Sequence, residues 1–210
     1  MLFDLDALPA SSRYKLLVST VVPRPIAWVV TQDAAGVLNA APYSFFNVFG
    51  SDPPVVALGV GNRPTGAAKD TLANIAATGE FTVCLVPETA LDAMNVTAAD
   101  FPPGEDEVAQ AGLTTLPSTK VRPPRLAESP VAMECTLFQT LPIGAHSMVI
   151  GQVRAMHIAD AAVMDPVKCY IDSPALGLVG RLHGAGWYTR TSDRMEVKRV
   201  SAADWMARKD

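Results

Sequence analysis

The first residues that suggest chemistry are Lys69, Asp70 and Thr71, which stand directly before an apolar segment with helical spacing. A lysine, a threonine hydroxyl and free amides at a helix N-terminus are groups that bind a phosphate. The same residues also fit a simple helix start, with Asp70 or Thr71 as the cap and Lys69 in solvent. No GxxxxGK[ST] loop occurs and no GxGxxG follows a strand, so Walker-type and Rossmann-type sites are not expected.

A second segment with unusual chemistry runs from Asn39 to Asn47 with the sequence NAAPYSFFN. Pro42 has no backbone N–H, so it interrupts any strand ladder at this point. The backbone groups near Ala41 to Ser44 are then free to face a planar ligand with a polar edge and apolar faces. The alternative is an edge strand with a β-bulge and no ligand.

The three histidines, His146, His157 and His183, lack the spacing of a metal site, and no CxxC pair accompanies them. His146 follows a turn and precedes a strand, so its side chain can reach a cleft or serve a structural role. No GxSxG motif occurs, so a serine hydrolase is not expected. The carboxylates of residues 105–107 lie in a loop with glycine and proline, and we predict that they are solvent-exposed.

A glycine-rich loop over residues 180–188 (GRLHGAGWY) surrounds Arg181 and ends in two aromatic residues. Such a loop can bring its backbone close to a ligand. It also fits a turn whose aromatic side chains pack against the body of the protein.

β-Branched and alternating apolar runs predict the strands that position these groups. Residues 26–31 form the first strand, and a turn at 33–36 leads into an irregular second arm over 37–49. The remaining strands are predicted at 54–60, 81–86, 131–141 and 146–158, the last two as an antiparallel hairpin. A final hairpin is expected over 187–200, with its turn at 191–195.

The helices are few and short. Helical spacing predicts a helix over 70–78, which ends at Gly79, and a shorter one over 88–94. Residues 97–130 are the least regular part, which is typical of a functional or mobile insertion. Strands in series with short turns favour an antiparallel barrel or sandwich over a parallel doubly wound sheet, and no domain boundary is visible.

Composition limits the class of protein. The 210 residues carry a net charge of −4, with 49% hydrophobic and 18% charged residues. The absence of a basic stripe argues against a nucleic-acid partner. The high apolar content favours a homo-oligomer with an apolar interface. Three cysteines without a pairing pattern, an acidic N-terminus and the lack of an apolar run long enough for a membrane predict a cytoplasmic protein.

Taken in order, these segments resemble the flavin reductase-like proteins of the FMN-binding split-barrel class. Most of residues 10–190 take part in the resemblance, and its first block is the most specific. The matching blocks are VPRPIAWVVTQDAAGVLNAAPYSFFNVFGSDPPVVALGV (22–60), KDTLANIAATGEFTVCLV (69–86), GAHSMVIGQV (144–153) and GRLHGAGWY (180–188).

The resemblance implies one domain over residues 1–210, with 97–130 as an irregular insertion and 189–210 as a C-terminal tail. The implied fold is all-β to α+β: a six-stranded antiparallel split β-barrel of Greek-key type with a few short helices. It also implies a homodimer with one FMN per subunit near the interface. The implied chemistry is hydride transfer from NADH or NADPH to flavin N5, with a monooxygenase or another electron acceptor as a partner.

The resemblance assigns site residues by motif. The polar edge of the flavin ring goes to four consecutive residues, chiefly through their backbone: Ala41, Pro42, Tyr43 and Ser44. The phosphate goes to the three residues at the start of the predicted helix: Lys69, Asp70 and Thr71. Arg24 is a further candidate for the phosphate, and Thr31 and Asn47 are candidates for the ribityl chain or the phosphate.

His146 matches a turn that lies beside the nicotinamide pocket in such proteins, so it is the candidate catalytic residue. Ala145 stands where an acidic residue is usual, which removes the carboxylate that would orient this histidine. Two other classes stay open. One is a flavoredoxin-like FMN carrier without catalytic use of a nicotinamide, and the other is an interaction barrel without a ligand.

Overall fold

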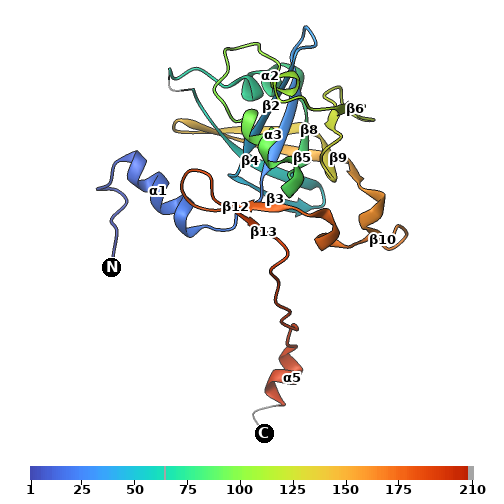
Figure 1. The fold of residues 1–210 in the computed structure, drawn as a ribbon. Coiled ribbons are helices and arrows are strands. Elements are labelled where there is room, and N and C mark those ends of the chain that lie inside the picture. The colour runs from blue at the N-terminus through green and yellow to red at the C-terminus, as the bar shows by residue number, and fades with distance from the viewer. Residues whose placement is uncertain (64, 208–210) are drawn as a thin grey trace.

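A seven-stranded antiparallel sheet forms the body of the protein in a computed structural model that describes residues 1–63 and 65–207 (Figure 1). Its strand order is β2-β1-β5-β8-β9-β4-β3. The bounds of these strands are β1 Ala27–Gln32, β2 Leu38–Tyr43, β3 Phe46–Ser51, β4 Pro54–Gly61, β5 Glu80–Leu85, β8 Val131–Ile143 and β9 His146–Ile158. Five of the predicted strands therefore occur within two residues of their predicted bounds.

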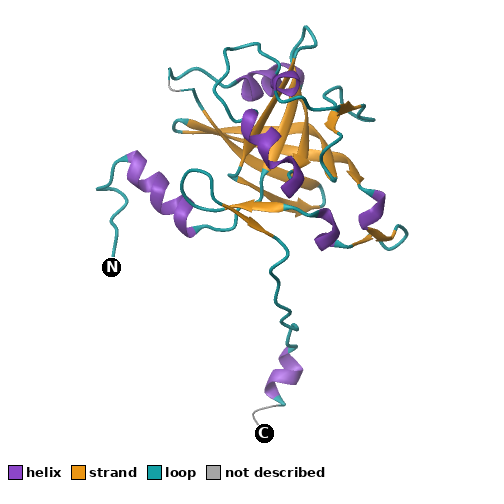
Figure 2. Ribbon diagram, in the orientation of Figure 1, coloured by secondary structure: helices purple, strands orange, loops and turns teal. Residues whose placement is uncertain are grey.

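The two edge strands of this sheet, β2 and β3, are consecutive in sequence. Only Ser44 and Phe45 connect them, although they lie at opposite ends of the strand order. The sheet must therefore curl until its edges meet at one corner (Figure 2). No ladder joins β2 to β3 within the described part of the chain, so the barrel stays split along this line. The structure has seven sheet strands and not the expected six, because the irregular arm over 37–49 divides into β2 and β3.

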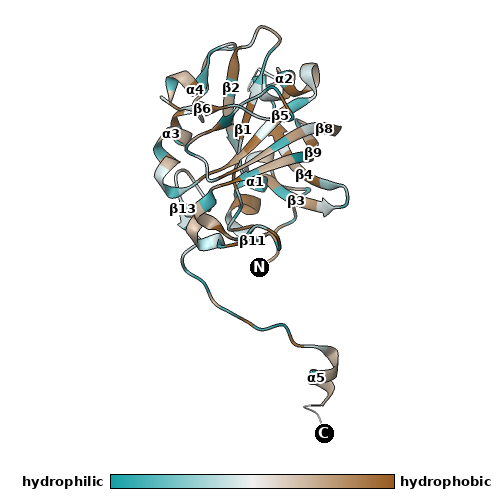
Figure 3. Ribbon diagram, turned by 90° about the vertical axis from the view of Figure 1, so that its right-hand side faces the viewer, coloured by the Kyte–Doolittle hydropathy of each residue, from teal (hydrophilic) through white to brown (hydrophobic). Residues whose placement is uncertain are grey.

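The interior of the curled sheet is apolar. Phe81 is fully buried there among alternating residues of several strands, which include Val29, Leu58 and Val83. Its ring fills the space that Gly151 leaves, since a Cβ at position 151 would lie 2.3 Å from the Phe81 Cζ atom. The strands accordingly carry much of the hydrophobic colour in Figure 3.

Residues 97–130 cover the other face of β1, β5 and β8, together with α3 (Leu91–Val96). The segment contains α4 (Glu107–Gln110) and a small ribbon of β6 (Thr115–Leu116) and β7 (Arg125–Leu126). Leu126 is buried in this second core, and Trp28 Nε1 donates to Thr97 Oγ1 over 2.9 Å. A contiguous apolar layer thus holds a segment that has little regular structure.

One buried carboxylate fixes the middle of this segment. Glu134 on β8 is fully buried, and its Oε1 accepts hydrogen bonds from Thr119 N over 2.8 Å and Thr119 Oγ1 over 3.1 Å. Oε2 accepts from the amide of Lys120, and His157 Nε2 lies 2.5 Å from Oε1. Glu134 on β8 therefore holds residues 119 and 120 against the sheet, and His157 on β9 contacts the same carboxylate.

The segment before β1 pairs with a segment that follows β9, through an isolated bridge between Arg24 and Arg181. The helix α1 (Ala10–Thr20), which the sequence pattern did not predict, leads into β1. A two-stranded ribbon, β12 (Val179–Arg181) with β13 (Tyr188–Arg190), follows the small elements η2 (Asp160–Ala162), β10 (Val163–Asp165), β11 (Tyr170–Ile171) and η3 (Ser173–Leu176). No helix in the described chain has both the length and the apolar character needed to cross a membrane.

The expected hairpin over 187–200 is wrong. Tyr188–Arg190 pairs backward with Val179–Arg181, because the loop between them closes through a hydrogen bond from Leu182 N to Trp187 O of 2.9 Å. Residues 191–201 form no strand, and the chain ends in α5 (Ala202–Met206). Figures 1 and 3 both show this tail leading away from the sheet. Residues 208–210 of the predicted tail lie outside the described residues.

The remaining predictions about helices are confirmed. α2 spans Asp70–Thr78, and Gly79 ends it with a left-handed φ of 70°. The short helix predicted over 88–94 is a 3-10 turn, η1 (Glu88–Ala90), that continues into α3. These two helices lie on either side of the region that the sequence analysis assigned to a ligand.

Candidate functional site

A small cavity of about 80 Å³ lies at the open edge of β2, and we call it the β2 cavity. It brings together six residues that the sequence analysis assigned to a ligand: Ala41, Pro42, Tyr43, Lys69, Asp70 and Thr71. Residues 97–101, from the segment that covers the sheet, close its outer side. Two stretches of sequence about 30 residues apart therefore meet here, as the family resemblance implied.

The N-terminus of α2 points at this cavity without a side-chain cap. Lys69 occupies the N-cap position and makes no capping hydrogen bond. The prediction that Asp70 or Thr71 caps the helix is wrong, because both side chains are bound elsewhere. Asp70 Oδ2 accepts from Arg63 Nη2 over 3.0 Å, and Thr71 Oγ1 donates to Asn39 Oδ1 over 2.9 Å. The first amides of the helix and its dipole thus remain available to an anion.

Asn39 is the centre of a buried network behind the cavity. Its Oδ1 accepts from Thr71 and, over 3.4 Å, from Thr31 Oγ1. Its Nδ2 donates to Glu107 Oε2 over 2.8 Å. Thr31 is fully buried and does not line the cavity, so its expected contact with a ribityl chain or phosphate is not supported. The side chain instead supports Asn39 and accepts from Asn74 Nδ2 over 3.1 Å.

Glu107 corrects a second expectation. We predicted a solvent-exposed carboxylate, but only 7% of this residue is exposed. Asp106 caps α4 by accepting from Ala109 N over 3.0 Å, and this start of the helix turns Glu107 inward. Its Oε2 accepts from Ala40 N over 3.2 Å, which satisfies a backbone amide on the open edge of β2. Asp106 before a helical turn was the available sequence signal.

Tyr43 supplies a buried donor that has no partner. Its hydroxyl is buried next to the Thr71 side chain, and no hydrogen bond of full geometry reaches it in the described structure. Burial raises the pKa of Tyr43 to about 12, so the hydroxyl keeps its proton at neutral pH. A buried polar group without a partner costs free energy, and native proteins rarely leave one unless a ligand or water completes it. Because Tyr43 also lines the β2 cavity, a bound acceptor there would complete it.

The charges around the cavity leave one lysine available. Arg63 forms an ion pair with Asp70 and also donates to Phe101 O over 3.3 Å. Glu107 accepts its two hydrogen bonds as described. Lys69 pairs with none of the described carboxylates, although it lines the cavity. A lysine, an unpartnered hydroxyl and an uncapped helix N-terminus together form a site for a phosphate-sized anion.

A larger cavity of about 470 Å³ adjoins the first, and we call it the loop cavity. The two cavities share the lining residues Pro42 and Ala98. Ser44, the remaining member of the predicted ring edge, lines the loop cavity. The volume of the loop cavity lies in the range of small-molecule sites. Two cavities thus lie side by side along β2, one with groups suited to a phosphate and one large enough for a ring system.

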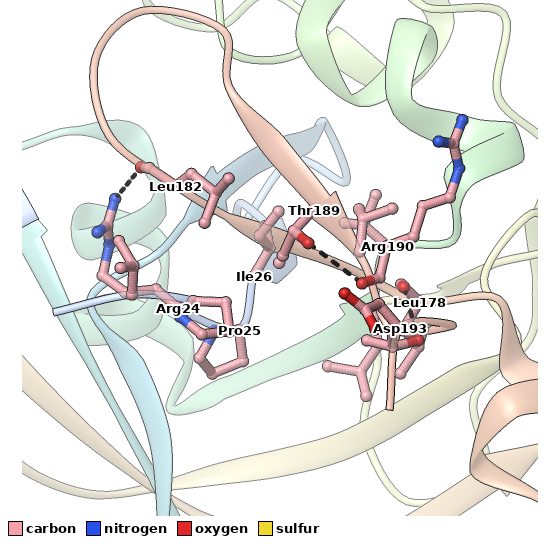
Figure 4. A pocket seen from close by; sticks show the side chains of 15 residues that line it. Arg24, Pro25, Ile26, Leu178, Leu182, Thr189, Arg190 and Asp193 are labelled. Atoms are coloured by element: carbon pink, nitrogen blue, oxygen red, sulfur yellow. Dashed lines mark hydrogen bonds between the residues drawn. The ribbon is translucent and has the colours of Figure 1, made fainter. Parts of the chain in front are cut away.

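Arg24 lies outside both cavities. Its Nη1 donates to Val18 O over 2.7 Å and Val21 O over 2.9 Å, and Nη2 donates to Leu182 O over 2.9 Å. Nε donates to Ser44 Oγ over 3.3 Å, so the guanidinium fastens α1 and the glycine-rich loop to the β2–β3 corner. The predicted phosphate contact is therefore not supported. Arg24 lines a separate apolar cavity of about 610 Å³ on the other side of the β12–β13 ribbon (Figure 4).

Asn47 and His146 also lie away from the β2 cavity. Asn47 is exposed on β3, beside a shallow apolar hollow. His146 is exposed at the start of β9, and the nearest aromatic ring is Phe45, with the two ring centroids 6.5 Å apart. Phe45 in turn lies 6.2 Å from Tyr14, which lines the loop cavity. Within one chain, Phe45 and Tyr14 thus separate His146 from that cavity.

Sequence reasoning missed three contributors to the site: Asn39, Arg63 and Glu107. Asn39 and Arg63 stood inside the two segments that drew attention, but no pattern separated them from their neighbours. The structure reveals their roles because each contacts a residue distant in sequence, and such contacts leave no local signature.

Comparisons with known proteins identify the family of the chain. Residues 18–173 match the model of the flavin reductase like domain. An uncharacterized protein of Deinococcus radiodurans is 46% identical over 207 residues, which is 97% of this chain and 91% of the relative. Nitrilotriacetate monooxygenase component B from Bacillus cereus superposes with a TM-score of 0.88 at 33% identity, covering 94% and 98% of the two chains. The 2-nitrobenzoate 2-nitroreductase NbaA of Pseudomonas fluorescens gives 0.88 at 32% identity, covering 96% and 98%.

Proposed function

Given that the chain belongs to the flavin reductase-like family, we propose that it is an oxidoreductase that binds FMN and reduces it with NADH or NADPH. The observation that carries the proposal is the Tyr43 hydroxyl, a buried donor without a partner beside Lys69 and the uncapped start of α2. Bound FMN would supply the redox chemistry, since its ring accepts a hydride from the nicotinamide. The protein's own residues would bind and orient it.

The β2 cavity fits the phosphate of FMN. Lys69 supplies a cation, Tyr43 and the first amides of α2 supply donors, and Asn39 fixes Thr71 behind them. The volume of about 80 Å³ suits a terminal phosphate and is too small to hold also the adenosine monophosphate by which FAD exceeds FMN, which favours FMN over FAD. The ring system would then occupy the loop cavity, with Pro42 and Ser44 along its edge, whereas Ala41 and Tyr43, which the resemblance assigned to the ring, would lie at the phosphate.

His146 is the proposed residue beside the nicotinamide. Its exposed position next to Phe45 suits contact with a co-substrate that arrives from solvent. His146→Ala should slow reduction by NADH or NADPH while FMN affinity stays within about threefold of the parent. A normal rate of reduction in this variant would remove His146 from the site.

We further propose a homodimer. Val48 and Phe49 on β3, and Phe138 and Ile143 on the projecting half of the β8–β9 hairpin, are all exposed large apolar residues. Such residues are normally covered in a stable protein by another surface. Sedimentation should give twice the mass of one chain, and Phe49→Lys should shift it toward the monomer.

The test of the main proposal is an anaerobic titration. The protein is mixed with FMN, then with NADH or NADPH in separate experiments, and the flavin absorbance near ~450 nm is followed. Rapid loss of this band with either nucleotide is the expected result. Tight FMN binding without bleaching would point to a flavoredoxin-like carrier, and no FMN binding would contradict both.

The phosphate assignment has its own control. Lys69→Ala combined with Thr71→Ala should weaken FMN binding by about 100-fold, since one contact to a charged group is worth roughly 1.5 to 3 kcal/mol and Thr71, through Asn39, anchors the start of α2. Lys168→Ala is the matched control, because Lys168 is an exposed lysine that pairs with Asp165. Unchanged affinity in the double variant would contradict the assignment.

A further inference from the structure

Arg181 is the one charged side chain that lines the loop cavity in the described structure, and the proposed contacts do not use it. The other residues around the cavity are neutral: Tyr14, Ile26, Pro42, Ser44, Met94, Asn95, Ala98, Ala185, Gly186 and Tyr188. The Arg181 guanidinium lies 4.6 Å from the centroid of the Tyr188 ring. Its Nη2 donates to Gly184 O over 2.9 Å, and none of the described carboxylates pairs with it.

The β12–β13 ribbon determines where this charge points. Arg181 is directly opposite Tyr188 in the register, so the two side chains project to the same face. That face lines the loop cavity, whereas Gly180 and Thr189, the next pair, line the apolar cavity on the other side. Val179 and Arg190, the third pair of the ribbon, also line the apolar cavity. The ribbon therefore lies between the two cavities, and Arg181 is the one cation that it presents to the loop cavity.

The backbone around Arg181 is fixed. Arg24 N donates to Arg181 O over 3.0 Å, and Arg181 N donates to Arg24 O over 2.8 Å. At Gly180, a Cβ would lie 2.9 Å from Pro23 Cβ, so the ribbon is held close to the chain before β1. The nearby Arg24 donates to four protein oxygens, whereas Arg181 donates to one. Arg181 thus keeps free donors on a rigid support.

We propose that Arg181 faces the flavin ring in the loop cavity and stabilises the negative charge that the ring gains on reduction. The proposal rests on the proposed function, in which the FMN phosphate occupies the β2 cavity. A hydride carries two electrons and one proton, so the neutral oxidised ring becomes an anion while the nicotinamide leaves as its oxidised cation. A fixed cation in a cavity that is partly shielded from water stabilises such an anion more than it does in bulk solvent.

The experiment measures how Arg181→Gln changes the affinity for each redox form. Affinity for oxidised FMN, followed by flavin fluorescence, should stay within about threefold of the wild type. Affinity for reduced FMN should fall about tenfold, which for a two-electron couple lowers the midpoint potential by about 30 mV. Arg181→Lys should recover most of the shift, because the charge is kept.

Arg190→Gln is the matched control. Arg190 lies on the same ribbon but is exposed and pairs with Glu88, so the midpoint potential should not move. Arg181→Met provides a second neutral variant of similar length if the glutamine variant unfolds, and near-ultraviolet circular dichroism checks the fold of each. The two neutral variants should show the same shift.

Three outcomes would overturn the proposal. An unchanged midpoint potential with wild-type affinities removes Arg181 from the ring. An equal loss of affinity for both redox forms makes Arg181 a binding or packing residue only. A wild-type protein that fails to bind FMN contradicts the proposed function itself, which separates that failure from failure of the role assigned to Arg181.

Discussion

Glu107 and Glu134 are both buried carboxylates that hold the 97–130 segment to the sheet. They differ in whether the polar groups around them have hydrogen-bond partners within the protein. Glu134 accepts from Thr119 and Lys120 and contacts His157, so both of its oxygens are used within the protein. Glu107 accepts from Asn39 and Ala40, and Asn39 carries the network on to Thr71 at the edge of the β2 cavity. The nearby Tyr43 hydroxyl and Lys69 remain without protein partners among the described residues.

The difference separates a structural network from a binding site. Burial imposes the same cost on both carboxylates, and each offsets it through hydrogen bonds. Only the network at β2 leaves unpaired donors, and these donors converge on a cavity. We call the hydrogen bonds around Glu134 the closed network and those around Glu107 and Tyr43 the open network. Substitutions in the closed network should therefore change stability, whereas substitutions in the open network should change FMN affinity.

The largest expected effect concerns the closed network. Glu134→Ala should lower the free energy of unfolding by about 3 to 5 kcal/mol, since it leaves buried donors without an acceptor. Urea denaturation measures this loss. Glu80→Gln is the control, because Glu80 forms an outer ion pair with Arg122 and should change stability by less than about 1 kcal/mol. Equal losses of unfolding free energy in Glu134→Ala and Glu80→Gln would show that the network around Glu134 contributes no more than an exposed ion pair.

The pH dependence should follow the same carboxylate. Burial alone would raise the pKa of Glu134, but hydrogen bonds from His157, Thr119 and Lys120 lower it to about 2, below the ordinary value of 4.5. A depressed pKa stabilises the protein above the unfolded pKa, and this contribution disappears as pH falls from about 4.5 toward 2. The loss is on the order of 3 kcal/mol.

Denaturation between pH 5 and pH 2.5 tests this expectation. The wild-type free energy of unfolding should fall more steeply than that of Glu134→Gln, whose side chain does not titrate. If the free energies of unfolding of the two proteins fell in parallel with pH, Glu134 would not be the cause of the loss of stability in acid.

Tyr43→Phe tests the open network. We expect FMN affinity to fall about tenfold, because one hydrogen bond to a charged group is lost. Stability without FMN should stay the same or rise slightly, since the variant removes a buried donor that has no partner. Fluorescence titration and thermal melting give the two values. A loss of stability without a loss of FMN affinity would mean that the Tyr43 hydroxyl serves the fold and not the ligand.

The smallest effect should have the opposite sign. Glu107→Gln keeps an acceptor for Asn39 and Ala40 but removes a negative charge from the lining of the β2 cavity. FMN affinity should therefore rise by about threefold, with stability lowered by roughly 1 kcal/mol. A titration against Asp92→Asn, a change outside the lining of the cavity, provides the baseline. Weaker binding in Glu107→Gln would mean that the carboxylate itself orients a ligand.

The sequence patterns correctly predicted the elements whose bounds depend on neighbouring residues in the chain. The spacing of Leu72 and Ile75 and the stop at Gly79 fixed the bounds of α2, and alternation fixed the β8–β9 hairpin. Lys69 and Thr71 could be assigned to one site with Tyr43 because each belonged to a segment with its own signal. The longest element that these patterns missed is α1, since its one buried residue, Val18, leaves almost no amphipathic pattern.

Contacts between distant residues explain the failures. The closest partners of Arg24, Glu107 and Glu134 lie far away in the chain or on another element, and no sequence pattern states where a side chain will find an acceptor. The wrong prediction of a hairpin over 187–200 has the same cause, because Tyr188–Arg190 pairs with Val179–Arg181, which precedes it in the chain.

The order of these residues along the chain also constrains synthesis. All described parts of the β2 cavity lie between Asn39 and Glu107, whereas the loop cavity needs Arg181 and Tyr188. Chains emerge from the ribosome N-terminus first, at a rate that separates these residues by several seconds. Every described residue that lines the β2 cavity is therefore synthesised well before Arg181 and Tyr188, which line the loop cavity. In the proposed function, FMN would then use both cavities only after the β12–β13 ribbon has left the ribosome.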